Sequence, residues 1–262
     1  MSGMLAPEVL VLGATGRVGR GVVAALLEAG SPVLAVARDA GRLAALVEHH
    51  ADEPALQVLA CDIDGDAGAG ALAASLAARP RVLRAVVDAM APVRRAGRLL
   101  EQPSTALVET LQRELEPRLA AARQLLPRLR GTGTRRYVLV GGPGTRCGWA
   151  GYGHASIAGA ATRMLAQVLH EEAQELGVRL QLLSVDALVW AEDNAGQACT
   201  GWHSALGVGR GVVSLLASKA ADRRCVVDYS PVVGNAPPAL LACDFESVLG
   251  SASGAPGAGQ AA

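Results

Sequence analysis

The chain has 262 residues, of which 51% are apolar and only 3% aromatic, and its 24 basic and 24 acidic residues leave no formal net charge. This length predicts one large α/β domain whose core is built mainly from Ala, Leu and Val. Neither the charge balance nor the composition gives a reason to expect nucleic acid as a partner, and no stretch has the 18 or more continuous apolar residues of a membrane span.

The cysteines are scattered, odd in number and without a C-x-x-C pair; they are Cys61, Cys147, Cys199, Cys225 and Cys243. This pattern predicts neither a disulfide framework nor a metal site. The N-terminus runs into a predicted strand within eight residues, so we expect no signal peptide. Together these features favour a cytoplasmic location.

Short apolar runs alternate with stretches of helical periodicity along the whole chain. Strands are expected at 8–13, 32–38, 55–64, 81–91, 135–142, 178–188 and 224–230, and helices at 16–30, 40–51, 69–78, 105–130, 156–176 and 206–220. This alternation predicts an α/β fold, a Rossmann-type doubly wound parallel sheet of about seven strands with helices on both faces. We expect a single domain over residues 1–249 and a disordered Gly/Ala-rich tail over 250–262.

The turn between the first strand and the first helix reads G-A-T-G-R-V-G, with Gly13, Gly16 and Gly19 at intervals of three. Glycine lets the backbone turn sharply and approach a diphosphate without a Cβ atom in the way, and the N-terminus of the following helix offers free N–H groups. Because the motif lies in the first turn of a predicted βαβ unit, it predicts a dinucleotide-binding loop.

The spacing G-x-x-G-x-x-G resembles the short-chain dehydrogenase/reductase superfamily, in its extended or atypical branches. The resemblance in element order spans roughly residues 8 to 230. It implies a nicotinamide cofactor, a small-molecule substrate, and a homodimer or homotetramer formed through the fourth and fifth helices.

Charge at the end of the second strand bears on the choice of cofactor. Ala37 stands where a carboxylate would bind the ribose diol of NAD(H), Arg38 follows it, and Arg17 lies in the glycine loop. Two guanidiniums suit a 2′-phosphate, so we expect NADP(H) rather than NAD(H). If the alignment were shifted by one residue, Asp39 would stand at the carboxylate position and the preference would be for NAD(H). Asp62 resembles the family's aspartate that contacts the adenine amino group. The residues expected to bind the cofactor are Gly13, Thr15, Gly16, Arg17, Val18, Gly19, Arg38, Asp62, Ile63 and Ala89.

The resemblance also implies a catalytic tetrad, in which Tyr donates a proton, Lys lowers its pKa, Ser polarises the carbonyl and Asn holds a water. Four residues after Tyr152 stands Ser156, not Lys. A second registry, which fits the rest of the helix without an insertion and which we prefer, places Gly159 at the lysine, Ala155 at the tyrosine and Gly142 at the serine. The lysine is absent in both registries, and Glu114 stands at the asparagine position.

Candidates for the missing catalytic group lie near the carboxyl ends of the fourth to sixth strands. They are Tyr152, His154, Asp88 and Asp186, with Glu114 as a further candidate. His154 is a candidate because an imidazole is able to shuttle a proton, and Tyr152 would donate a proton without the lysine if a shorter loop places it near the nicotinamide. Each also has an ordinary interpretation, as a surface histidine or a tyrosine packed at a helix start. Likewise, Glu114 has Arg118 as a helical partner four residues on.

Two further segments have ordinary interpretations as well. Arg94, Arg95 and Arg98 after the fourth strand would grip an acidic substrate or form a solvated loop, and we favour the solvated loop. Trp190 and Trp202 fall where the superfamily forms its substrate lid, and they indicate either an apolar wall against a ligand or ordinary packing.

Three functions therefore remain open. The first is an NADP(H)-dependent oxidoreductase with a non-standard proton donor, acting on a small apolar carbonyl or conjugated substrate. The second is a lyase, isomerase or cyclase on the same scaffold. The third is a nucleotide-sensing regulator without turnover. Fold alone does not choose among them.

Overall fold

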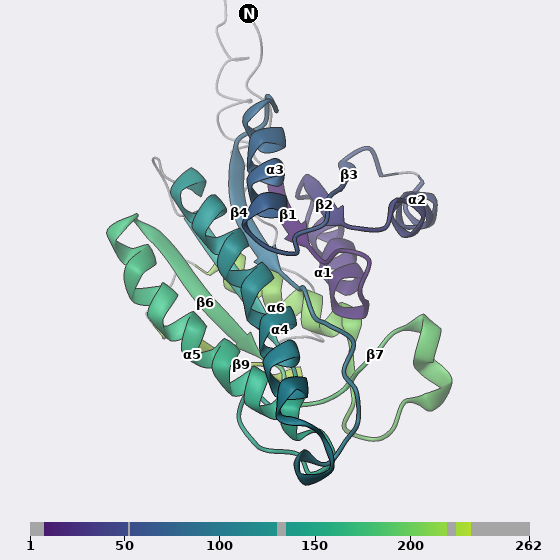
Figure 1. Cartoon of the computed structure of the whole chain (residues 1–262). Helices are drawn as coiled ribbons and strands as arrows, with labels where there is room; N and C mark the ends of the chain where they lie inside the picture. The colour runs from purple at the N-terminus through teal and green to yellow at the C-terminus, as the bar shows by residue number, and fades with distance from the viewer. Residues whose placement is uncertain (1–7, 52, 130–134, 219–223, 232–262) are drawn as a thin grey trace, which may run out of the picture.

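The computed structural model describes residues 8–51, 53–129, 135–218 and 224–231 (Figure 1). The strands are β1 (Glu8–Leu12), β2 (Val33–Ala37), β3 (Leu56–Ala60), β4 (Leu83–Asp88), β5 (Arg135–Gly141), β6 (Val178–Ser184), β7 (Val189–Trp190), β8 (His203–Ser204) and β9 (Val226–Asp228). The helices are α1 (Arg17–Glu28), α2 (Ala40–His49), α3 (Asp66–Ala77), α4 (Ser104–Leu125), α5 (Gly153–Glu175) and α6 (Ala205–Ala217), with short 3₁₀ turns η1 (Leu99–Glu101), η2 (Leu126–Leu129) and η3 (Glu192–Gln197).

The main sheet has seven parallel strands in the order β3-β2-β1-β4-β5-β6-β9. The direction of winding reverses between β1 and β4, which leaves a crevice at their carboxyl ends where ligands bind in such folds. The predicted Rossmann-type sheet is therefore confirmed.

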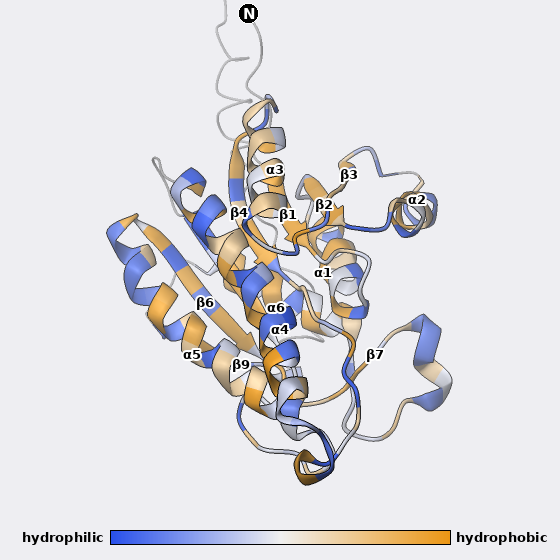
Figure 2. Ribbon diagram, in the orientation of Figure 1, coloured by the Kyte–Doolittle hydropathy of each residue, from blue (hydrophilic) through white to orange (hydrophobic). Residues whose placement is uncertain are grey.

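Two apolar cores lie on the two faces of this sheet. Alternation along β1 sends Val9 and Val11 into the core shared with α1, α2 and α6, and sends Leu10 and Leu12 into the core shared with α3, α4 and α5. Figure 2 shows apolar residues along the central strands and polar residues on the outer turns of the flanking helices. Burial on both faces explains why these strands read as continuous apolar runs.

Helices α1 and α6 cross at a contact between glycines. Both helices contain the sequence VGRGVV, at 18–23 and 208–213. A Cβ atom on Gly21 would lie 2.1 Å from the Ala205 carbonyl oxygen, and one on Gly209 would lie 2.1 Å from the Gly21 carbonyl oxygen. The two backbones therefore touch, and α6 fixes the position of the helix that begins at the glycine loop.

Two expectations from the sequence need correction or lie outside the described residues. The strand expected at 178–188 ends at Ser184, and the chain continues into a small lobe of β7, η3 and β8 that lies beside α1 (Figure 1). Local periodicity did not predict this lobe because its two strands have two residues each. The expected tail at 250–262 and the end of the predicted domain at 249 lie outside the described residues.

Candidate functional site: a glycine loop beside a rebuilt catalytic face

The glycine loop packs closely against the end of β4. Gly13 has φ 70°, and a Cβ atom there would lie 2.8 Å from the Ala89 carbonyl oxygen. A Cβ atom on Gly19 would lie 2.1 Å from the Gly13 carbonyl oxygen, so neither position admits a side chain. Helix α1 begins after Gly16 without a side-chain cap. The first-turn amides, including that of Val18, therefore lack a side-chain acceptor and form a cradle suited to a diphosphate.

The residues at the ends of β2 and β3 form the next part of this surface. Arg38 is exposed directly after β2, whereas the carboxylate of Asp39 accepts the Arg42 N–H at 2.9 Å and caps α2. The Arg42 guanidinium in turn donates from Nη2 to the Thr15 carbonyl oxygen at 2.9 Å. Sequence reasoning missed Arg42, whose signal was its place three residues after a capping aspartate.

Asp62 and Ile63 lie two and three residues after the end of β3, where the adenine contact was expected. Asp62 is exposed, and Ile63 is buried in the core shared with α3 and α4. The Asp62 carboxylate is therefore accessible from solvent, whereas the Ile63 side chain is packed in the core.

Arg17, which was expected to bind the cofactor, forms an ion pair with the small lobe. Its Nε lies 3.3 Å from an oxygen of Asp193 in η3, and Arg20 lies 3.2 Å from the other oxygen of the same carboxylate. Because these side chains are about half exposed, the pairs are individually weak. They nonetheless connect the lobe of β7, η3 and β8 to the first turn of α1.

Asp88 at the end of β4 is fully buried. Its Oδ1 accepts the Met90 N–H at 3.0 Å and lies 3.4 Å from Nη1 of the buried Arg118, which also pairs with Glu114 at 3.2 Å. Burial raises the pKa of Asp88, and the Arg118 charge opposes that rise. Asp88 thus belongs to an internal ion cluster, and the expected Glu114–Arg118 pair is present.

Tyr152 and His154 lie at the start of α5. Tyr152 occupies the N-cap position, its side chain is 41% exposed, and its carbonyl oxygen accepts the Ser156 hydroxyl at 3.0 Å. His154 is half-buried in the first turn. The structure therefore brings these two together at the rim of the face, while Asp88 lies in the interior.

A polar network joins the loops at the carboxyl ends of β5 and β6, and of its members only Asp186 was a candidate from the sequence. The Thr145 and Ser184 hydroxyls lie 3.0 Å apart, and the Ser184 hydroxyl donates to Asp186 Oδ1 at 3.2 Å. Arg146 binds the other oxygen of Asp186 at 3.0 Å. These groups are far apart in sequence, and only the parallel register of β5 with β6 brings them together.

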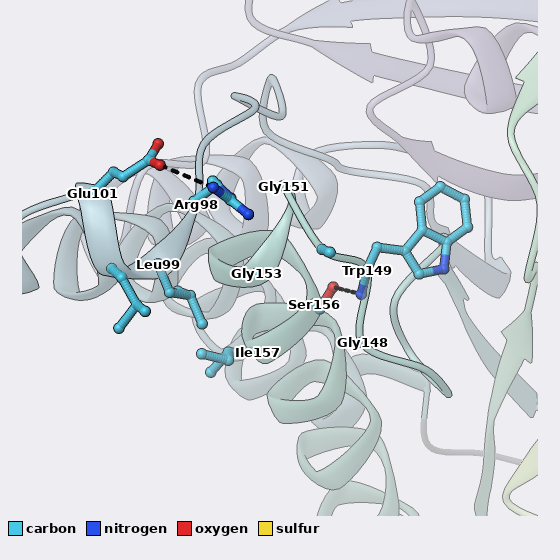
Figure 3. Close-up of a pocket in the computed structure, with 11 residues that line it drawn as sticks. Arg98, Leu99, Glu101, Gly148, Trp149, Gly151, Gly153, Ser156 and Ile157 are labelled. Carbon is cyan, nitrogen blue, oxygen red and sulfur yellow. Dashed lines mark hydrogen bonds and ion pairs between the residues drawn. The ribbon is translucent and has the colours of Figure 1, made fainter.

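An apolar pocket of about 520 Å³ opens between the loop before α4 and the start of α5 (Figure 3). Leu99, Leu100, Trp149 and Ile157 are the large apolar side chains that line it. The Ser156 hydroxyl accepts the Trp149 N–H at 3.0 Å and so holds the 148–151 loop against α5. The lining is suited to an aliphatic or aromatic group of a small ligand.

The family model for short chain dehydrogenases matches residues 7–187. The chain belongs to the short chain dehydrogenase family. Within the residues that the structure describes, no cluster of His, Cys, Asp and Glu suited to a metal ion occurs, and no helix is long and apolar enough to span a membrane.

Solved structures of other proteins share the short chain dehydrogenase fold. One is an apo short chain oxidoreductase from Pseudomonas aeruginosa PAO1, described as containing an atypical catalytic center; it has 21% identity, a TM-score of 0.74, and coverage of 86% of this chain and 96% of that chain. Its NADPH-bound form has 22% identity, a TM-score of 0.75, and coverage of 86% and 95%. The RhlG/NADP active-site complex from the same species has 19% identity, a TM-score of 0.72, and coverage of 88% and 97%. None of the curated proteins compared matches the chain.

In this member of the short chain dehydrogenase family, neighbouring atoms occupy two of the positions that our preferred registry assigns to the tetrad. At the lysine position, a Cβ atom on Gly159 would lie 2.9 Å from the carbonyl carbon of Gly144 and 3.1 Å from the Thr145 nitrogen. At the serine position, a Cβ atom on Gly142 would lie 2.5 Å from Nη2 of Arg94. The family's side chains therefore do not fit there without movement of these groups.

Proposed function

We propose that this protein is an NADP(H)-dependent oxidoreductase that acts on a small carbonyl or conjugated substrate with an apolar part, and that its proton donor is not the family's tyrosine-lysine pair. Membership of the short chain dehydrogenase family supports the oxidoreductase class. The glycine cradle at the switch point between β1 and β4 carries the proposal, because Gly13 and Gly19 leave no room for side chains where a diphosphate would approach.

The residues that would hold the cofactor fit its chemistry. The first-turn amides of α1 would bind the diphosphate, Asp62 and Ile63 would contact the adenine, and Arg38 with Arg42 would bind the 2′-phosphate. When bound, the reduced nicotinamide supplies the hydride.

The structure supports NADP(H) over NAD(H) through Asp39. One of its carboxylate oxygens, Oδ1, caps α2 by accepting the Arg42 N–H, and the guanidiniums of Arg38 and Arg42 lie on either side of it in the sequence. The NADPH-bound oxidoreductase and the NADP-bound RhlG of Pseudomonas aeruginosa share the fold and are in keeping with this choice.

Tyr152 and His154 remain the proposed proton donors, with water as the alternative, because both lie at the rim near the apolar pocket. Asp88 is not retained as a donor in this proposal, since its carboxyl is fully buried and paired with Arg118. Replacing Tyr152 with Phe or His154 with Gln separates the two candidates, because the true donor alone should change the pH dependence of turnover.

Titration with NADPH and NADH, followed by nucleotide fluorescence, tests the cofactor assignment. Wild-type protein should prefer NADPH, and Arg42→Ala should reduce that preference about 10- to 100-fold, the value of a charge-assisted bond to phosphate. Arg113→Ala is the control, because it removes an equal charge from the exposed face of α4. Absence of binding to either nucleotide at millimolar concentration would contradict the proposal.

A nucleotide-binding protein without hydride transfer is the second candidate. The backbone of Gly144 and Thr145 against Gly159 favours it, because that contact closes the family's lysine position. A carbonyl panel monitored at 340 nm discriminates between the two functions, since binding without any change in absorbance supports the second candidate. A lyase or isomerase would turn over substrate without a change at this wavelength.

We also propose that the protein is a homodimer or homotetramer assembled through α4 and α5. Apolar side chains lie exposed on these helices, among them Val108, Met164 and Val168. Light scattering after gel filtration tests this assembly, and a Met164→Glu variant should shift it toward monomer. The four described cysteines are all free, which supports the proposed cytoplasmic location.

A further inference from the structure

Arg94 differs from the other two arginines of its loop. Arg98 has 78% of its side chain exposed and pairs with Glu101, and Arg95 is exposed. Arg94 is instead half-buried, and its Nη1 donates to the Pro143 carbonyl oxygen at 2.5 Å. The expectation of a solvated loop is therefore wrong for Arg94, whose side chain reaches from the loop after β4 to the loop after β5.

The Arg94 guanidinium lies at the position that the preferred registry gives to the family's serine. A Cβ atom on Gly142 would lie 2.5 Å from Nη2 and 3.3 Å from Cζ of Arg94. A serine side chain and this guanidinium therefore compete for one volume, and the guanidinium occupies it.

Arg94 has N–H donors that make no hydrogen bond within the described residues, in contrast to the neighbouring Arg118. Arg118 already binds Asp88, Glu114 and the Met90 carbonyl oxygen. Among the described residues, Pro143 is the hydrogen-bond partner found for Arg94, and only Nη1 is used. Burial lowers the pKa of Arg94, with the Glu114 charge opposing and the Arg118 charge adding to that shift, but a guanidinium stays charged near neutral pH.

We propose that the unused edge of the Arg94 guanidinium binds two oxygens of the substrate, and that the substrate is an oxo acid, a carbonyl compound with a neighbouring carboxylate and an apolar tail. This inference rests on the proposed function and narrows its substrate class. A guanidinium edge matches a pair of oxygens in one plane, which a 2-oxo acid presents and a lone ketone does not. The same two loops that position Arg94 also line the apolar pocket, which suits the tail.

Calorimetric titration with 2-oxohexanoate and with the neutral 2-hexanone tests this inference on the full chain, with and without saturating NADP. Wild-type protein should bind the acid at least about tenfold more tightly than the ketone. Arg94→Gln keeps a neutral donor near Pro143, and it should weaken binding of the acid about 10- to 100-fold while leaving the ketone unchanged. Arg94→Lys should recover part of the loss, and Arg95→Ala, in the exposed neighbour, should change neither.

Equal affinity of wild-type protein for the two probes, no binding of either, or an Arg94→Gln variant that binds the acid as wild type does would overturn the inference. Circular dichroism of each variant confirms that it folds. NADPH fluorescence on the same preparations distinguishes the two proposals. Loss of nucleotide binding in wild-type protein contradicts the proposed function, whereas an Arg94-dependent preference for the acid in the nucleotide-free titration would still support the anion site.

Discussion

Restoring the family's lysine should destabilise this protein rather than restore a standard active site. Gly159 lies buried within α5, where the backbone of the 143–145 segment packs against it. In Gly159→Lys, the new Cβ atom would lie 2.9 Å from the Gly144 carbonyl carbon, 3.0 Å from its oxygen and 3.1 Å from the Thr145 nitrogen. These are backbone atoms, and Gly144 already has φ 97°, so the segment has little freedom to move away.

The magnitude follows from two opposing effects. Forcing atoms into a packed site costs about 1–3 kcal/mol, and contacts with backbone place this site near 3 kcal/mol. Removing a glycine from a helix interior returns up to about 1 kcal/mol. We therefore expect a net loss of about 2 kcal/mol, or about 4–8 °C in Tm for a chain of this size.

Urea denaturation of wild type, Gly159→Lys and Ala160→Lys measures this loss. Ala160 is exposed on the same helix, so its lysine variant should remain within about 0.5 kcal/mol of wild type. If Gly159→Lys were as stable as Ala160→Lys, or oxidised NADPH faster than wild type on a carbonyl panel, the packing at this position would be misjudged.

Three further predictions concern the loop, the buried cluster and pH. Gly19→Ala should abolish nucleotide binding by fluorescence because its Cβ atom would lie 2.1 Å from the Gly13 carbonyl oxygen, whereas Gly70→Ala, with no atom within 4 Å, should be neutral or stabilising. Asp88→Ala should lower the free energy of unfolding by about 3 kcal/mol in urea, because it leaves the buried Arg118 with one fewer counter-charge; a loss under 1 kcal/mol would contradict the cluster. The pKa of His50 is lowered, chiefly by burial, so His50 binds its proton at a higher pH in the unfolded chain than in the folded one. The Tm should therefore decrease as the pH is lowered below 6.5, and the decrease should be smaller in His50→Gln.

The fold was predictable because its signals are local. The strands β1 and β2 read as continuous apolar runs because both of their faces are covered, and α1 shows its apolar face at helical spacing. The glycine loop was predictable for the same reason, since the glycines that its close backbone contacts require lie within one short segment of the sequence.

The site was only partly predictable because the residues that contact one another there are distant in sequence. Nothing near Arg17 indicates that it pairs with Asp193, and nothing near Arg94 indicates that it reaches Pro143. Those contacts depend on how loops from different strands meet at one edge of the sheet. A sequence pattern predicted which tetrad residues are absent, and the three-dimensional packing shows which atoms lie beside the glycines at two of those predicted positions.

The glycines at the serine and lysine positions argue for a rebuilt site rather than a decayed one. Loss of large side chains without compensation would leave cavities, and a cavity destabilises the residues that line it. Here the Arg94 guanidinium fills the volume beside Gly142, and the backbone of Gly144 and Thr145 fills the volume beside Gly159. A larger residue at position 159 would meet backbone atoms, whereas one at position 142 would have to displace the Arg94 side chain. The same structure keeps a cradle at Gly13 with no room for a Cβ atom, and it places the Arg94 guanidinium beside Gly142, to which our preferred registry assigns the family's serine. Substrate binding at this face would then depend on the fixed positive charge of Arg94 rather than on a serine hydroxyl. That charge favours a carboxylate beside the carbonyl group, which a neutral ketone lacks.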